Sequence, residues 1–171
     1  MATALAAALC AGTALYAPAS SAEPAAPVAA EAVVCESTAQ NTVKVPALGD
    51  TTFEGTGTIT CKNAQGETLL EGATTFSGTT PAPDAGDGVT PVYRARVDWK
   101  DGTVSTGTFT DVRQQVGADG VVEVTINGVN DASSTRFASW SVAIAAQSAR
   151  VSVDPSGEIH NKVTGTVTYT P

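Results

Sequence analysis

Apolar and polar residues alternate with a period of two along most of the chain from residue 33 onward, and Gly-rich turns interrupt the alternation. In an extended strand, such alternation places the apolar side chains on one face and the polar side chains on the other. Turn signals recur about every ten residues, a spacing typical of β-sandwiches and small barrels. The pattern predicts strands at 33–38, 42–45, 52–62, 68–77, 92–99, 103–116, 121–129, 136–145 and 162–170.

These strands predict an all-β fold in a single domain at 33–171. We expect an antiparallel β-sandwich of about seven to nine strands, Ig-like or Greek-key, with a closed up-and-down β-barrel as the alternative. The chain has 171 residues, 42% of them hydrophobic, which is enough for one core, and no change of composition marks a second domain. The segment 137–153 is ambiguous because its Ala-rich part also suits a helix; we expect a strand followed by irregular chain.

One hairpin has a register that the sequence specifies. Within 93–99 the odd positions are apolar and the even positions charged, and a Lys-Asp-Gly loop follows at 100–102. A three-residue loop with Gly in the left-handed conformation suits this sequence. It pairs Tyr93 with Phe109 and points Phe109 inward, whereas a two-residue Asp-Gly loop would turn Phe109 outward. Because the apolar parity changes after Phe109, we expect a bulge near Asp111.

Composition narrows the classes of function. Only 15% of the residues are charged, well below the usual quarter or so, and Thr takes over much of the polar role with roughly 25 copies. The net charge of −8 favours solubility and argues against nucleic-acid binding, which needs clustered Lys and Arg. Aromatic residues make up 5% of the chain, so the core must consist mainly of Val, Ala, Leu and Ile.

The N-terminal segment has the pattern of a secretory signal. Residues 5–16 form an Ala-rich apolar run that is too short for a membrane-spanning helix, which needs about 20 residues. Small residues and Pro follow, so we expect residues 1–22 to be a signal peptide cleaved after Ala22, or after Ala19 as second choice. An ordinary N-terminal helix is the alternative. Residues 23–32, rich in Ala and Pro, are expected to be a disordered tether, and the mature form then has no membrane span.

The three cysteines predict one disulfide bond. Cys10 lies inside the expected signal, which leaves Cys35 and Cys61 as an even pair in an oxidising compartment. A Cys35–Cys61 bridge would close a loop of about 25 residues, worth roughly 3 kcal/mol in the chain-entropy model. A metal site is the alternative for two cysteines, but the chain has a single His and no Cys-x-x-Cys motif. A buried free pair is a further alternative.

Two stretches resemble a known group of sequences. The residues Trp-Lys-Asp-Gly-Thr-Val-Ser-Thr-Gly-Thr-Phe-Thr at 99–110 and Thr-Gly-Thr-Val-Thr-Tyr at 164–169 are similar to uncharacterised secreted β-rich proteins of actinomycetes. The resemblance covers about the second half of the chain and rests on turn and strand motifs. It implies a secreted β-sandwich-like domain of unknown role, and it carries over no catalytic residue.

No motif in the sequence supplies catalytic chemistry. Nucleophilic catalysis needs a His near Ser or Cys, and His160 lies in a Gly-Glu-Ile-His-Asn segment of a chain without a Gly-x-Ser-x-Gly elbow, so we interpret it as an exposed turn residue. Spacing selects no pair among the 17 acidic residues for glycoside hydrolysis. The acidic Gly loops at 84–88 and 127–131 could hold Ca²⁺ but lack EF-hand spacing. We therefore expect no catalytic, cofactor-binding or metal-binding residues.

The sequence thus predicts a secreted, non-catalytic protein, a binding or cell-surface structural module whose partner is an extracellular polysaccharide or protein. A secreted protease inhibitor is the alternative, with the Pro-containing loop 78–91 as its inhibitory loop, and a secreted hydrolase is the second alternative. A binding face is expected on the outward side of the 92–110 hairpin, where Thr and Arg share one surface. Its residues are Arg94, Arg96, Thr106, Thr108 and Thr110.

Overall fold

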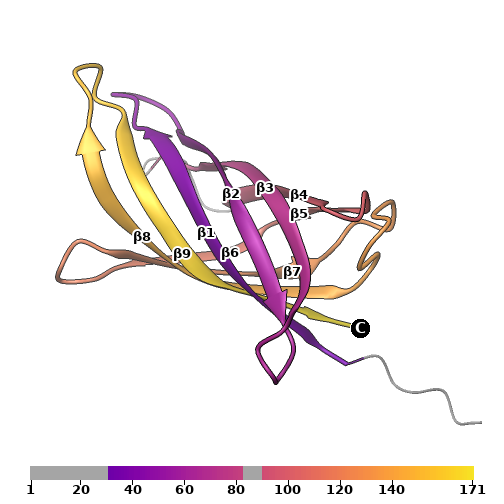
Figure 1. Ribbon diagram of the computed structural model, residues 1–171. Coiled ribbons are helices and arrows are strands. Elements are labelled where there is room, and N and C mark those ends of the chain that lie inside the picture. The colour runs from indigo at the N-terminus through magenta and orange to yellow at the C-terminus, as the bar shows by residue number, and fades with distance from the viewer. Residues whose placement is uncertain (1–30, 83–89) are drawn as a thin grey trace, which may run out of the picture.

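The computed structural model describes residues 31–82 and 90–171, and in these ranges the chain forms β-strands and no helix (Figure 1). All nine strands belong to one antiparallel sheet, which curls into a half-barrel around its apolar face. In the described part of the chain, no helix is long and apolar enough to cross a membrane. The strands are β1 (Val33–Lys44), β2 (Thr51–Lys62), β3 (Thr68–Thr80), β4 (Val92–Trp99), β5 (Val104–Phe109), β6 (Asp111–Val116), β7 (Val122–Val129), β8 (Ser141–Val153) and β9 (Ile159–Thr170).

The strand order brings the two ends of the sheet together. The order is β5-β4-β3-β2-β1-β9-β8-β7-β6, so β1 pairs with both β2 and β9 in the middle of the sheet. The two end strands, β5 and β6, are consecutive in the chain, and only Thr110 separates them. The sheet therefore bends back on itself and surrounds its inner face, in the direction that strand twist favours.

This architecture corrects the sandwich that the sequence predicted. A single sheet curls over its own apolar face, where a sandwich would cover that face with a second sheet. Alternation of apolar and polar residues is the same in both arrangements, because it records only that one face is buried. The strand limits also differ from expectation, since 33–44 is one continuous strand and β8 extends to Val153 through the segment expected to be irregular or helical.

The β4–β5 hairpin has the predicted register. Tyr93 pairs with Phe109, and Gly102 closes the turn with a φ of 83°. Phe109 is accordingly buried, with 3% of its surface exposed. In place of the bulge predicted near Asp111, the chain changes partner strand: it leaves β5 at Phe109 and enters β6 at Asp111, and the inward-facing parity changes across Thr110.

The loop between β7 and β8 covers the outer edge of β5. The backbone amides of Asp131 and Arg136 donate to the carbonyls of Thr106 and Val104, at 2.8 and 3.0 Å. The hydroxyl of Ser134 accepts a further hydrogen bond from the Thr106 amide at 3.0 Å. Free strand edges can pair with other chains, so this loop protects the end of the sheet.

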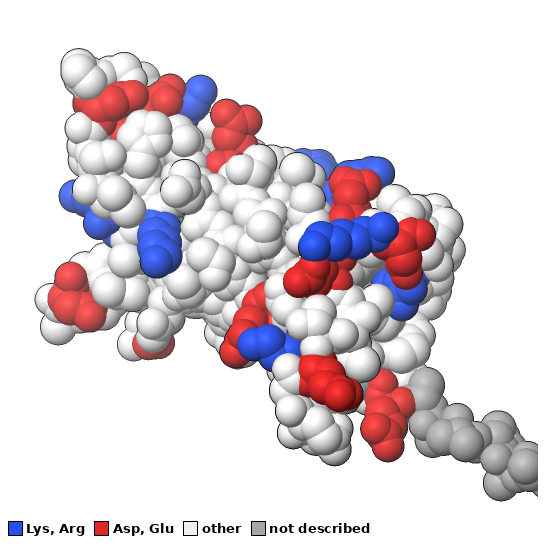
Figure 2. Space-filling model, viewed as in Figure 1, with Lys and Arg blue, Asp and Glu red and all other residues white. Residues whose placement is uncertain are grey.

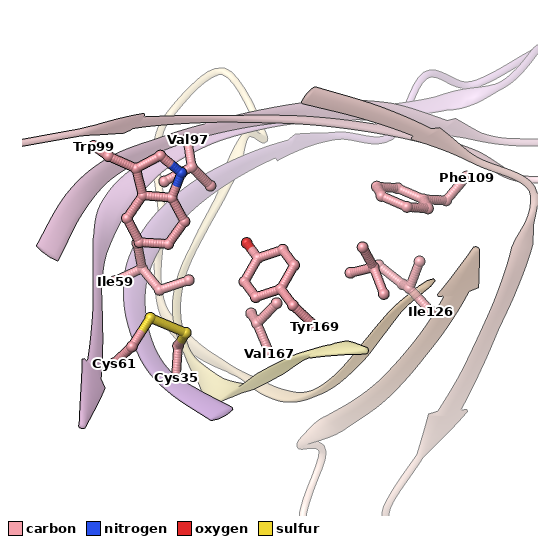
Figure 3. Packing of buried hydrophobic residues seen from close by; sticks show 10 residues of the cluster. Cys35, Ile59, Cys61, Val97, Trp99, Phe109, Ile126, Val167 and Tyr169 are labelled. Atoms are coloured by element: carbon pink, nitrogen blue, oxygen red, sulfur yellow. A yellow bond between two sulfur atoms is a disulfide. The ribbon is translucent and has the colours of Figure 1, made fainter. Parts of the chain in front are cut away.

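Cys35 and Cys61 join β1 to β2. The two residues are register partners, their Sγ atoms lie 2.06 Å apart, and both side chains are buried. The predicted pairing is therefore present in the structure. Ile59 lies next to the bond on the inner face of β2 (Figure 3).

The aromatic side chains of the described residues form two groups on the inner side of the sheet. In the first, Tyr93 lies between 5.8 and 6.1 Å from the ring centres of three Phe residues. In the second, Phe137 stacks on Tyr169 with ring centres 4.3 Å apart. The first group is Phe53, Phe76, Tyr93 and Phe109, and the second is Trp99, Phe137, Trp140 and Tyr169.

Candidate functional site

A cavity of about 280 Å³ lies inside the curled sheet. All nine strands contribute inner-face side chains to its wall, and most of these are apolar. The volume is close to the lower limit of ligand pockets in proteins, about 300 Å³. Because protein interiors normally leave few voids larger than a water molecule, a space of this size is a candidate binding site.

Small side chains explain why the interior is not filled. Ala39 on β1 is the register partner of Gly57 on β2, and Ala146 on β8 is the register partner of Gly165 on β9. Since β1 also pairs with β9, these four inner positions lie on neighbouring strands and carry nothing larger than a methyl group. This part of the wall is thin and leaves space that the side chains opposite it do not fill.

One end of the cavity is closed by packed side chains. The Cys35–Cys61 disulfide lies at this end, and the rings of Trp99 and Tyr169 meet edge to face above it (Figure 3). The indole Nε1 of Trp99 donates to Ser105 Oγ at 2.9 Å, so its polar atom is satisfied in the core. A ligand would therefore have to enter from the opposite end.

The opposite end is where the β1–β2, β6–β7 and β8–β9 turns lie, and Figure 1 shows the β6–β7 hairpin diverging from β8 there. β8 pairs with β7 only as far as Ser148, and its last residues continue past β7. Five of the described residues around this opening have exposed aliphatic side chains. They are Val45, Leu48, Val116, Val151 and Val153, each more than half exposed.

Two polar atoms in the cavity wall are buried without a hydrogen-bond partner among the described residues. They are the amide oxygen Oδ1 of Asn41 on β1 and the hydroxyl oxygen Oγ1 of Thr74 on β3. Leaving such an atom buried and unpaired costs about 1–3 kcal/mol. Asn41 lies three residues before the end of β1, toward the open end, whereas Thr74 lies deeper, at the level of Ala39.

Two phenols add neutral polar atoms to the wall. Burial raises the pKa of Tyr93 and of Tyr169, and the neighbouring Tyr93 raises the pKa of Tyr169 further. Both hydroxyl groups therefore stay protonated. Among the described residues of the wall, Arg150 and Arg96 are charged, although the Arg96 guanidinium lies on the outer face beside Asp98, and there is no carboxylate, Lys or His. The wall can hold an apolar body and form hydrogen bonds, but it offers no acid–base pair for proton transfer.

The predicted binding face on the β4–β5 hairpin is assembled only in part. Arg94 pairs with Thr108 and Arg96 with Thr106, so these four side chains share the outer face as expected. Arg96, however, binds Asp98, because its Nε donates a hydrogen bond of 2.9 Å to the carboxylate. This hydrogen bond lowers the pKa of Asp98. The β7–β8 loop half-covers Thr106, and Thr110 lies outside both neighbouring strands. The face shown in Figure 2 mixes acidic and basic side chains without a patch of one sign.

His160 has more neighbours than the sequence indicated. It was expected to be an exposed turn residue, but it lies in β9, half-buried, with Nδ1 3.2 Å from Thr42 Oγ1 and Nε2 3.6 Å from Asp154 Oδ2. Asp154, Glu158 and His160 each place a potential metal-ligand atom within 4.8 Å of the others. Lys44 Nζ forms an ion pair with Glu158 Oε1 at 3.2 Å. A metal ion at this cluster would have to displace the lysine.

The other loops named from the sequence divide into two cases. The whole acidic loop 84–88 and the centre of the proposed inhibitory loop 78–91 lie outside the described residues. The second acidic segment, 127–131, is not a loop at its start, because its first three residues belong to β7. Asn130 is buried and its Nδ2 donates to the Phe137 carbonyl at 3.2 Å, so its side chain joins β7 to the β7–β8 loop.

Sequence reasoning missed Asn41 because the polar run Ala-Gln-Asn-Thr at 39–42 resembled a break between two strands. Once 33–44 is treated as one strand, Asn41 has the parity of Cys35 and Ala39 and must face inward. A polar residue at an inward position was therefore the signal that pointed to the site. Comparison with protein-family models, with curated proteins and with solved structures finds no match to this chain.

Proposed function

We propose that this protein is a secreted, non-catalytic binding protein that takes up a small, mostly apolar molecule inside its curled sheet. The observation that carries the proposal is the cavity of about 280 Å³, whose wall all nine strands line and one end of which packed side chains close. Its wall supplies apolar contact and neutral hydrogen-bonding groups, which suit binding rather than bond cleavage.

The expected affinity is moderate. A ligand that loses about 200 Å² of apolar surface to the cavity gains about 5 kcal/mol at 25 cal/mol per Å². One hydrogen bond adds about 1 kcal/mol, and immobilising the ligand offsets part of the gain. Dissociation constants from about 0.1 mM into the millimolar range follow.

The extracellular location is part of the same proposal. A buried disulfide is compatible with an oxidising compartment outside the cell, and the N-terminal pattern favours export. Of the two rival functions, the inhibitor depends on a loop whose centre lies outside the described residues. The hydrolase would have to use the hydroxyl of Thr42, which lies 3.2 Å from His160 Nδ1 with two carboxylates nearby, and this cluster lies on the outer face of the sheet, away from the cavity.

A pair of variants tests the cavity. Ala146→Leu adds bulk to the wall, whereas Ala145→Leu makes the same change one residue earlier, on the exposed outer face. With fluorobenzene as the probe, fluorine NMR titration should show saturable binding to the wild type and to Ala145→Leu, and at least tenfold weaker binding to Ala146→Leu. Equal binding by both variants, or no saturable binding to the wild type, would contradict the proposal.

A further inference from the structure

We infer that the ligand of this cavity is a neutral alcohol or phenol, whose hydroxyl group donates a hydrogen bond to Asn41 Oδ1 or Thr74 Oγ1. This inference rests on the proposed function and names the chemical class of the molecule bound there. The two buried atoms have no partner among the described residues, although more than nine in ten buried polar groups in proteins have one. Both residues line the cavity inside the curled sheet.

The strand between the two residues supplies no partner for either atom. β2 lies between β1 and β3 in the sheet, and its inner residues opposite Asn41 and Thr74 are Gly55 and Gly57. Neither glycine has a side chain that could donate to the amide oxygen or to the hydroxyl. Both atoms are buried in the ligand-free structure, so the side chain has to turn toward the cavity for a ligand to reach its oxygen.

The register also explains why neighbouring polar groups do not supply the missing bonds. Asn41 faces Asn161 of β9 across the sheet, yet its Oδ1 is unpaired. The flanking residues Gln40 and Thr42 point to the outer face, where Thr42 contacts His160. The inner side of β1 thus carries an acceptor atom near its end, with Val43 as the last inner residue beyond it.

The electrostatics of the wall select a neutral donor. A carboxylate ligand would place negative charge against the Asn41 oxygen. The cation of the wall, Arg150, lies in the same register row, but it is exposed to solvent, which screens its attraction for such a ligand. A buried ammonium group would need a carboxylate partner, and the described residues of the wall include none. A hydroxyl group carries a donor without net charge, and an aromatic or aliphatic body suits the Val, Ile and Phe side chains around it.

A matched set of probes tests this class. para-Fluorophenol has the donor, para-fluoroanisole has the same oxygen with its hydrogen replaced by methyl, and fluorobenzene has neither. Fluorine NMR titration should show that the wild type binds the phenol about tenfold more tightly than the anisole, the equivalent of about 1.4 kcal/mol. Equal affinity for the phenol and the anisole would overturn the inference while leaving cavity binding intact, whereas failure of all three probes would contradict the proposed function itself.

Variants locate the acceptor. Asn41→Leu and Thr74→Val remove one polar atom each at nearly constant shape, and at least one of them should abolish the preference for the phenol while keeping the binding of fluorobenzene. Thr58→Val is the matched control, because Thr58 is exposed on the outer face of β2 and should keep the preference. Because the lost atoms are unpaired in the ligand-free protein, both inner variants should unfold at the same temperature as the wild type or higher. A preference unchanged in both, or a large loss of stability in both, would contradict the inference and indicate that bound water or the fold itself uses these atoms.

Discussion

The ring of Phe76 on β3 lies against Gly55 on β2, its direct register partner, so closely that a Cβ at position 55 would collide with Phe76 Cζ. The arrangement is repeated in reverse two residues along, where the ring of Phe53 lies against Gly78. These pairs let two aromatic rings lie flat on the inner face of β2 and β3 beside Tyr93. They form one wall of the cavity.

Gly55→Ala should destabilise the protein by about 1–3 kcal/mol, the usual cost of overpacking a core. The added methyl group would meet both the Phe76 ring and the backbone carbonyl of Gln40. Urea unfolding measures the loss, and Phe76→Ala supplies a double-mutant cycle. In the double variant, the stability lost through the clash between the new methyl group and the Phe76 ring should be regained, but not the stability lost through the clash with the Gln40 carbonyl. A Gly55→Ala protein as stable as the wild type would show that this wall is loosely packed.

Cys61→Ser should cost about 2–5 kcal/mol, the usual loss when a small domain loses its disulfide. The change also leaves the buried Cys35 thiol unpaired at the closed end of the cavity. Thermal unfolding of the variant, compared with the reduced wild type, measures the effect. Peptide mapping without reductant should recover the 35–61 cross-link, and two free thiols in secreted protein would contradict the pairing.

Local chemistry allowed much of the fold to be predicted. The Lys-Asp-Gly turn fixes the register of the β4–β5 hairpin, because only a three-residue loop buries both Trp99 and Phe109. Cys35 and Cys61 could be paired because the third cysteine lies in the expected signal. In both cases one short-range constraint decided the outcome.

The closure of the sheet could not be predicted in this way. Alternation shows that Phe109 and Val112 face inward on either side of Thr110. It does not show that the chain pairs with β4 before Thr110, as β5, and with β7 after it, as β6. Asn41 was hidden for a similar reason. Its extended conformation depends on pairing with Gly55 and Asn161, which are distant in the chain. The candidate site is a product of these long-range pairings.

Raising the pH above about 10 should destabilise the protein through Tyr93 and Tyr169. Burial raises both pKa values in the folded state, so the stability they contribute is fully present below the unfolded pKa of about 10 and is lost as pH rises beyond it. Circular dichroism and tyrosinate absorbance should change together on alkaline titration. Tyr93→Phe should shift this transition to higher pH, and tyrosinate formation in a protein that stays folded would contradict the expectation.

Acid should weaken the β8–β9 turn through Asp154. Its carboxylate accepts hydrogen bonds from the Ser156 hydroxyl and from the amides of Ser156 and Glu158, and the first of these contributes most to lowering its pKa. A lowered folded pKa means that the contribution is present above about pH 4 and is lost as pH falls through the folded value. The melting temperature of Asp154→Ala should therefore lie below that of the wild type at neutral pH, and the difference should shrink in acid. If the difference in melting temperature did not change with pH, the stabilisation would come from the shape of the turn and not from the charge of Asp154.

Phe109 should prove the most costly single side chain to remove from the junction where the sheet closes. Its ring contacts Tyr93 of β4, with centroids 6.1 Å apart, and lies so close to Gly128 of β7 that no Cβ would fit there. It therefore packs against strands on both sides of the break between β5 and β6. Phe109→Ala should cost about 3–5 kcal/mol, whereas Thr108→Ala, on the exposed outer face, should stay within about 0.5 kcal/mol. Chemical unfolding of the two variants measures the contrast, and similar losses for both would mean that the junction is held by the backbone rather than by this ring.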